Sequence, residues 1–322
     1  MRPFLDFRKF RSIDNSRDPR RLDSDKTGLY RVLENVDADD QLMLHMKLGH
    51  VLLQSLTDPH SLWSNGNLCF VMDDDTFYRV NEDNTVTLLL AGITNQPMDY
   101  VDRGDGVIFF TNNYVIGYFD TDVHVFPTVS QNRKVPMIGG SLIDYFNSRL
   151  YTAYDDTLYY SDAGRPMIMD EEHGFARLGG RIKLLEFIAD GAFVGVGDKV
   201  IFLVPDAQDP PNFLWRKISD SPAIFGSGMK VEGIEYAKGI TGTVALWLSE
   251  DGIYMGMPEG RVAISSGSTF FTQGIERAAG TYRYDREWEM CTWAFQYKPD
   301  QESSNLKIMV PAPTISLANI IP

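Results

Sequence analysis

The segment SLWSNGNLCFVM, residues 61–72, decides the fold, because two short apolar runs flank a polar turn in it. Asn65-Gly66 in that turn is a strong β-hairpin signal, since glycine adopts a positive φ without steric cost. The same unit, with a second strand rich in Tyr, Phe and Val, recurs at 99–111, 144–154, 187–197, 246–257 and 281–295. Its turns are centred at Gly66, Gly106, Asn147–Ser148, Gly191, Gly252 and near Arg286, mostly about 40 residues apart.

Each of the first five units is followed by further short apolar strands, such as TFYRV and TVTLLL after the first and KVIFLV after the fourth. Four short strands in about 40 residues form one blade of a β-propeller. A four-stranded sheet with two apolar faces needs a neighbour on each face, and packing the blades around an axis provides both. The sequence therefore predicts an all-β fold, a β-propeller of five to seven blades, with six preferred.

Two segments depart from this repeat. The longest interval, from Gly191 to Gly252, contains AQDPPNFLWRKISDSPAIFGSG, whose Pro and Gly content predicts a long inserted loop at about 205–228. The first 26 residues hold eight basic and five acidic side chains, and Phe4, Phe7 and Phe10 lie among them. Turn residues follow, which favours an extended N-terminal arm (1–26) before a propeller domain (27–322); a short helix with an aromatic stripe is the alternative.

Composition narrows the possible functions. The 322 residues carry a net charge of −14, which disfavours sequence-reading contacts with nucleic acid but is compatible with a wall that DNA slides past. Cys69 and Cys291 are too few and too far apart for a disulfide framework or a zinc cluster. No secretory signal is visible, and no apolar run approaches the roughly 18 residues of a membrane span. We therefore expect synthesis in a cytoplasm and no membrane insertion by this chain.

No motif that carries catalysis is legible. The chain lacks a phosphate-binding loop, a zinc-protease motif and the GxSxG of a nucleophile elbow. Its five histidines share no ligand spacing. The acidic groups at 37–40, 73–75 and 170–172 do not fit the spaced calcium loop and are interpreted as solvated hairpin tips. SEDGIY (249–254) resembles a sialidase Asp-box only vaguely and occurs once. We expect no catalytic residue, no metal and no cofactor, and hence a protein that is not an enzyme.

The combined pattern resembles a family of virion structural proteins of tailed bacteriophages. FRSIDNSRDPRRL (10–22) corresponds to that family's N-terminal Phe-x-Gly-Ile-Asn-Asn segment, and LENVDADDQLMLHMKLGHVLL (33–53) is similar to its Asn-Val-Asp-Val-Asp-Asp strand pair. Residues 61–89, 149–166, 173–203 and 245–256 continue the resemblance in order. The family is similar in plan to the β-propeller nozzle and DNA-stabilisation proteins of short tails.

The resemblance implies a virion tail protein, made in the host cytoplasm, that forms a ring, expected to be hexameric, below the portal and adaptor. Genome DNA would pass through the ring without specific binding, and a fibre or spike would be a further neighbour. A receptor- or glycan-binding tail accessory is the alternative; a cellular scaffold propeller and a glycosidase are less favoured. We predict that assembly depends on the arm and on aromatic residues of the long loop. The expected contact residues are Phe4, Phe7, Phe10, Arg20, Arg21, Phe213 and Trp215.

Overall fold

The computed structural model describes residues 54–128, 133–206, 211–237, 240–264, 275–285 and 288–297, together with six short strands elsewhere. The regular structure of these residues is β-strand, apart from one 3-10 turn, η2 (Pro258–Gly260). They fall into two compact units, residues 51–217 and residues 1–50 with 218–322. The six short strands are β1 (Ser12–Ile13), β2 (Leu29–Tyr30), β3 (Val36–Ala38), β4 (Leu44–Met46), β29 (Lys307–Pro311) and β30 (Ile320–Ile321).

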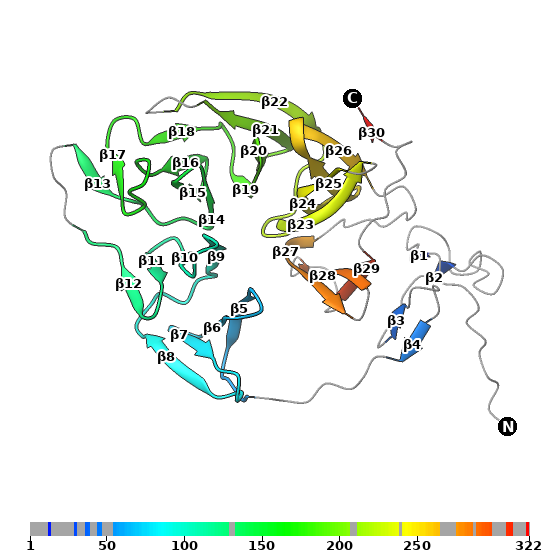
Figure 1. The fold of residues 1–322 in the computed structure, drawn as a ribbon, viewed down its shortest axis with the longest axis horizontal. Coiled ribbons are helices and arrows are strands. Elements are labelled where there is room, and N and C mark those ends of the chain that lie inside the picture. The colour runs from blue at the N-terminus through cyan, green and yellow to red at the C-terminus, as the bar shows by residue number, and fades with distance from the viewer. Residues whose placement is uncertain are drawn as a thin grey trace. The chain divides into compact units, whose positions relative to one another are not determined.

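Residues 51–217 contain four consecutive four-stranded sheets, which we call blades 1 to 4 (Figure 1). In each blade the strands pair in the order in which they follow along the chain. Blade 1 is β5 (Pro59–Ser64), β6 (Cys69–Asp73), β7 (Thr76–Val80) and β8 (Val86–Leu90); blade 2 is β9 (Asp99–Asp102), β10 (Ile108–Thr111), β11 (Ile116–Phe119) and β12 (Val123–Val125). Blade 3 is β14 (Leu142–Phe146), β15 (Arg149–Tyr154), β16 (Thr157–Tyr160) and β18 (Phe175–Arg177); blade 4 is β19 (Ile182–Ile188), β20 (Gly191–Val196), β21 (Lys199–Pro205) and β22 (Phe213–Ser219), whose last two residues pass beyond this unit.

The blades pack face to face because both faces of each central strand are apolar. Neighbouring side chains of a strand point to opposite faces. Phe110 of β10 joins a buried cluster with Phe70 and Phe77 of blade 1, whereas the adjacent Phe109 joins a second cluster with Leu150 of blade 3. One strand thus supplies the core on both of its sides. The repeat in the sequence predicts this packing, in which each blade has a neighbour on both faces.

Hydrogen bonds from the first strand of one blade to the first strand of the next, or to the residue just before it, reinforce this packing; we call them first-strand links. The Ser61 hydroxyl oxygen accepts the N–H of Met98 at 2.8 Å. The Asp99 carboxylate accepts the N–H of Ile143 at 2.8 Å. Asp144, 1% exposed, in turn accepts the N–H of Phe187 at 2.6 Å. Each link satisfies a backbone group at the joint between two blades and so fixes the register of one blade against the next.

The predicted hairpins are present. Asn147 and Ser148 form a two-residue turn between the paired residues Phe146 and Arg149, with φ of 47° and 61°. Such a turn needs positive φ at both central positions, and Asn tolerates this conformation better than most residues. Gly66 and Gly106 have φ of 90° and 89° and lie in longer turns, of four and five residues, that join β5 to β6 and β9 to β10.

At the two remaining glycines the turn centre lies elsewhere. Gly191 and Gly252 are the first residues of β20 and β25, so that the turns consist of residues 189–190 and 250–251. Gly191 is required by close packing: a Cβ atom there would lie 2.7 Å from the carbonyl oxygen of Leu203. The hairpin near Arg286 joins β27 (Ile275–Asp285) to β28 (Trp288–Tyr297), and the turn itself lies outside the described residues.

The interpretation of 205–228 as one long loop is wrong over residues 213–219, which form β22. Phe-Leu-Trp-Arg-Lys-Ile-Ser follows Pro210-Pro211 and shows no clean alternation of apolar and polar residues, so its strand character is masked in the sequence. Pairing with β21, rather than local pattern, makes it a strand. An extra ribbon, β13 (Lys134–Pro136) paired with β17 (Ile168–Asp170), lies outside the four blades.

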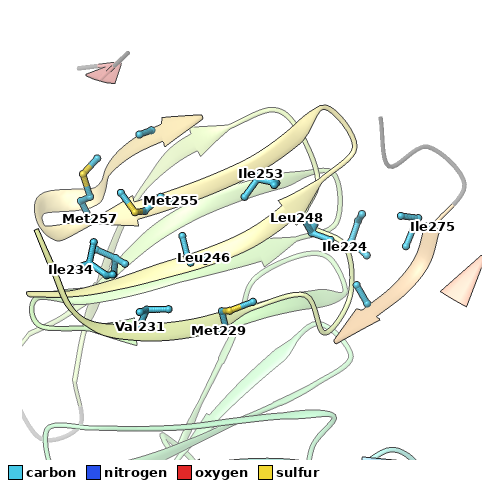
Figure 2. Close-up of a cluster of buried hydrophobic side chains, with 13 residues drawn as sticks. Ile224, Met229, Val231, Ile234, Leu246, Leu248, Ile253, Met255, Met257 and Ile275 are labelled. Carbon is cyan, nitrogen blue, oxygen red and sulfur yellow. The ribbon is translucent and has the colours of Figure 1, made fainter. Parts of the chain in front are cut away.

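The second unit has its own core. β23 (Met229–Ala237), β24 (Ile240–Ser249), β25 (Gly252–Met257) and β26 (Arg261–Ile264) form a sheet that β30 extends, and β27, β28 and β29 form a separate one. Leu246 and Leu248 lie on one face of β24 with Met255 of β25, as Figure 2 shows. Trp247, between them in sequence, stacks on Tyr254 instead, at 5.4 Å between ring centroids. Consecutive side chains of β24 thus point to opposite faces of its sheet, as they do in β10 of blade 2.

Candidate interaction surface

β22 is the last strand of blade 4, and among the described residues β21 is its only sheet partner. An edge strand presents a row of backbone N–H and C=O groups that another chain can use. The four consecutive residues 214–217, Leu-Trp-Arg-Lys, are all exposed. Its edge position among the described strands and its exposed apolar and basic side chains make β22 our candidate interaction surface.

Trp215 is the largest exposed side chain of β22, with 59% of its surface accessible, and Leu214 beside it is 71% exposed. The Nζ atom of Lys199, on the adjacent strand β21, lies 5.5 Å from the centre of the Trp215 ring. A cation over an aromatic face is attracted to the ring's negative quadrupole, which holds the ring in place. Trp215 is thus an exposed aromatic group with a partly fixed orientation.

Phe213 is placed differently from Trp215. It is half-buried, and its ring meets Tyr160 of blade 3 edge-on, with 5.3 Å between the centroids. Phe213 therefore anchors β22 to the neighbouring blade of its own chain, and we assign the outward contact to Trp215 and Leu214. The other expected contact residues, Phe4, Phe7, Phe10, Arg20 and Arg21, lie outside the described residues.

The last strands of the other three blades also expose apolar side chains. Leu88 on β8 is 57% exposed, Val125 on β12 is 48% exposed and Phe175 on β18 is 39% exposed. The sequence alone did not indicate these three residues as contacts, although each is an apolar residue at an outward position of a blade's last strand. Their recurrence means that exposed apolar groups are a regular property of these last strands.

In the acidic groups at 73–75 and 170–172, the first carboxylate of each group accepts backbone N–H groups. Asp73 accepts the N–H groups of Thr57 and Asp58 at 2.8 and 2.6 Å. Desolvation acts to raise the pKa of Asp170, but hydrogen bonds from the N–H groups of His173 and Glu172 and contacts with His173 and Lys134 outweigh it and lower that pKa to about 2. The group at 73–75 lies at the tip of the β6–β7 hairpin, as predicted. The prediction of a hairpin tip is wrong for 170–172, because β17 and β18 pair with β13 and β16 rather than with each other. Asp37, Asp39 and Asp40 have no described side-chain surroundings.

Across the described ranges, no three His, Cys, Asp or Glu side chains gather in an arrangement suited to a metal ion. In the same residues no helix is long and apolar enough to cross a membrane. Cys69, half-buried on β6, is a free thiol whose pKa burial raises.

Four-stranded sheets that follow one another along the chain and bury both faces against their neighbours are the blades of a β-propeller, and this all-β protein has that fold. The preferred count of six blades stays a prediction. No family model and no curated protein matches the sequence.

Several solved structures are similar in fold. The WD40 domain of Neurospora crassa Pan2 is 10% identical with a TM-score of 0.48, over 73% of this chain and 71% of that one. The N-terminal domain of Nup159 is also 10% identical, with a TM-score of 0.46, over 74% and 73% of the two chains. Virginiamycin B lyase from Staphylococcus aureus is 12% identical with a TM-score of 0.47, over 81% and 86%.

Proposed function

We propose that this chain is a structural component of a bacteriophage tail that assembles with copies of itself into a ring, expected to be hexameric, around the path of the exiting DNA. The exposed Trp215 and Leu214 on β22, the last strand of blade 4, carry the assembly part of this proposal. The phage assignment rests on the sequence resemblance. In this role the chain contacts the portal–adaptor complex and a fibre or spike, and its work is mechanical rather than catalytic.

The construction of the blades supports a mechanical role. Large aromatic side chains at the joints, such as Phe70, Phe77 and Phe110, are completely buried. The first-strand links connect each of blades 1 to 3 to the next blade. Well-packed interiors have low compressibility and transmit strain. A component that keeps its shape while DNA passes under pressure needs these properties.

The charge of the chain supports a wall that DNA does not adhere to. The net charge of −14 repels phosphates, and nonspecific DNA binding depends on their neutralisation by Lys and Arg. An acidic ring would thus let a duplex slide past. A fluorescence anisotropy titration with duplex DNA at low salt is expected to show no saturable binding.

Replacing Trp215 tests the assembly surface. In a phage that carries this gene, Trp215→Ala is expected to lower incorporation into particles at least about tenfold, because a central Trp anchor contributes about 2 kcal/mol or more to an interface. Tyr114→Ala is the matched control, since Tyr114 is an exposed aromatic (71%) on a turn of blade 2 rather than on an edge strand. Light scattering of the purified proteins gives their oligomeric state. Normal incorporation of the Trp215 variant would show that β22 is not part of the assembly interface.

The N-terminal segment is tested separately. Deleting residues 1–19 removes Phe4, Phe7 and Phe10, and we expect the shortened protein to remain folded but to enter particles poorly. A receptor- or glycan-binding accessory is the second candidate, for which exposed aromatic rings such as Trp215 would be the sugar-stacking groups. Glycan-array binding that Trp215→Ala abolishes, by a protein that remains monomeric, would favour that candidate over the ring.

A further inference from the structure

β5, the first strand of blade 1, contains an irregularity. Its pairing with β6 is regular at His60↔Met72 and resumes at Trp63↔Phe70, so Ser61 and Leu62 together lie opposite Val71 alone. Ser61 has a φ of 53°, in the left-handed region, and Leu62 is 72% exposed. A β-bulge of this kind turns side chains away from the directions that a regular strand would give them. Non-glycine residues with such φ values cluster at functional sites.

The bulge brings the Ser61 hydroxyl to the ring of His60. The Oγ atom of Ser61 lies 2.8 Å from Nδ1 of His60. On the other side of the ring, Nε2 lies 3.3 Å from the backbone carbonyl oxygen of Asp74, in the turn after β6. A carbonyl oxygen only accepts, so in the neutral ring Nε2 carries the proton and Nδ1 is the acceptor. The hydroxyl of Ser61 therefore donates to Nδ1.

The carbonyl that orients the ring is itself held in place. The backbone N–H of Asp74 donates to the carbonyl oxygen of Asp58 at 3.2 Å, and the Asn95 amide donates to the Asp74 carboxylate at 2.7 Å. The Ser61 oxygen also accepts the Met98 N–H, a donor that stabilises negative charge on that oxygen. A hydroxyl, a base within hydrogen-bond reach and a third group that orients the base form the arrangement of an activated nucleophile.

We propose that Ser61 is an activated nucleophile that takes an acyl group from activated esters, with His60 as its base. The Ser61 Oγ forms a bond to the acyl carbon, and its proton moves to Nδ1 of His60. The bond between that carbon and the leaving oxygen or sulfur breaks, and the leaving group takes the electron pair and then the proton from His60. The product is an O-acyl serine and a free phenol or thiol. This inference does not depend on assembly into a ring, but it goes beyond the purely mechanical role proposed above.

The experiment uses the full chain with two probes, an aryl acetate and a fluorophosphonate. The fluorophosphonate forms a Ser61 Oγ–P bond and releases fluoride. Intact-mass and peptide mass spectrometry are expected to find one adduct per chain, on the peptide that contains Ser61. A positioned general base contributes about 10²–10⁴-fold, so His60→Asn is expected to slow labelling at least 100-fold. His60→Asn leaves the hydrogen bond between Ser61 and Met98 in place, so we expect this variant to fold, which circular dichroism checks.

Ser61→Ala is expected to remove the adduct, and Ser64→Ala is the matched control on the same strand. Ser64 Oγ donates to the carbonyl oxygen of Leu68 at 2.9 Å and has no imidazole beside it in the described contacts. Labelling of His60→Asn at the rate of the unaltered protein, or an adduct on other residues, would overturn the proposal. Continuous phenol release that requires both His60 and Ser61 would support the dyad and count instead against a purely mechanical role.

Discussion

The carboxylate of Asp144 accepts the backbone N–H of Phe187 at 2.6 Å, across the joint between blades 3 and 4. The second carboxylate oxygen accepts the N–H of Tyr145 at 2.7 Å. A buried carboxylate is costly unless hydrogen bonds satisfy it, and here two backbone donors do so. The same residue thus completes the backbone hydrogen bonding of two strands.

Removing this carboxylate should be strongly destabilising. Asp144→Ala leaves two backbone N–H groups without their acceptor, and we expect a loss of about 2–4 kcal/mol in the free energy of unfolding. Asp144→Asn retains one acceptor oxygen and should lose less. Glu82→Ala, at an exposed position, is the control and should change stability by no more than about 0.5 kcal/mol. Urea unfolding followed by circular dichroism measures all three; equal midpoints for Asp144→Ala and the control would refute the link.

A methyl group at Gly140 should also be poorly tolerated. A Cβ atom there would lie 2.4 Å from the carbonyl oxygen of Ala153 and 2.9 Å from its nitrogen, and backbone atoms cannot move aside. We expect Gly140→Ala to cost about 3 kcal/mol, the upper end of the typical range for overpacked cores. Gly104→Ala, with a φ of +90° but open space around it, isolates the cost of conformation, about 1–2 kcal/mol. Thermal unfolding compares them, and the idea fails if Gly104→Ala proves the more harmful.

Two buried tyrosines should respond to phenylalanine in opposite directions. The Tyr100 hydroxyl is buried and has no hydrogen-bond partner among the described residues, and burial raises its pKa well above the usual value. Tyr100→Phe is therefore expected to stabilise the protein by about 1 kcal/mol. The Tyr160 hydroxyl donates to the carbonyl oxygen of His173, so Tyr160→Phe should destabilise it by a similar amount. Calorimetry that gives both changes the same sign would contradict this reading.

The low pKa of Asp170 predicts an acid-dependent loss of stability. Its pKa is about 2 in the folded chain, below the roughly 3.9 of an unfolded aspartate. Because the folded value is depressed, its contribution is fully present above about pH 4 and is lost as the pH falls toward 2. Carboxyl NMR should place the Asp170 midpoint near 2. Asp170→Asn should weaken the fall in the free energy of unfolding between about pH 4 and pH 2. If the Asp170 carboxyl instead titrates at about 3.9, its hydrogen bonds do not lower its pKa, and the prediction is wrong.

Much of the fold was predictable because it depends on local chemistry. The positions of the hairpins followed from residues such as Asn147 and Ser148, which tolerate positive φ. The continuous apolar runs of the repeated units, such as Val-Ile-Phe-Phe at 107–110, predicted sheets with two apolar faces. β22 was not predictable as a strand, because its pairing with β21 overrides a sequence that reads as a loop.

The candidate sites depend on contacts that local sequence does not reveal. Trp215 was singled out from composition, and its exposure keeps it a candidate, whereas Phe213 packs inward. The sequence assigns His60 no role, because the carbonyl oxygen that orients its ring belongs to Asp74, 14 residues further along the chain. A signal for the first-strand links does exist: Asp-Tyr occurs at 99–100 and again at 144–145, at the spacing of one blade.

The β13–β17 ribbon shows how this architecture can lengthen. Its two strands come from different connections, before β14 and after β16, and they pair with each other rather than with a blade. Lys134 braces them through Asp162 at 2.8 Å and Asp170 at 3.4 Å. The two strands pair with each other, and Met169 of β17 is buried in the cluster that also contains Phe109 of blade 2 and Leu150 of blade 3. A longer ribbon that keeps Met169 in this cluster should therefore leave the four sheets unchanged.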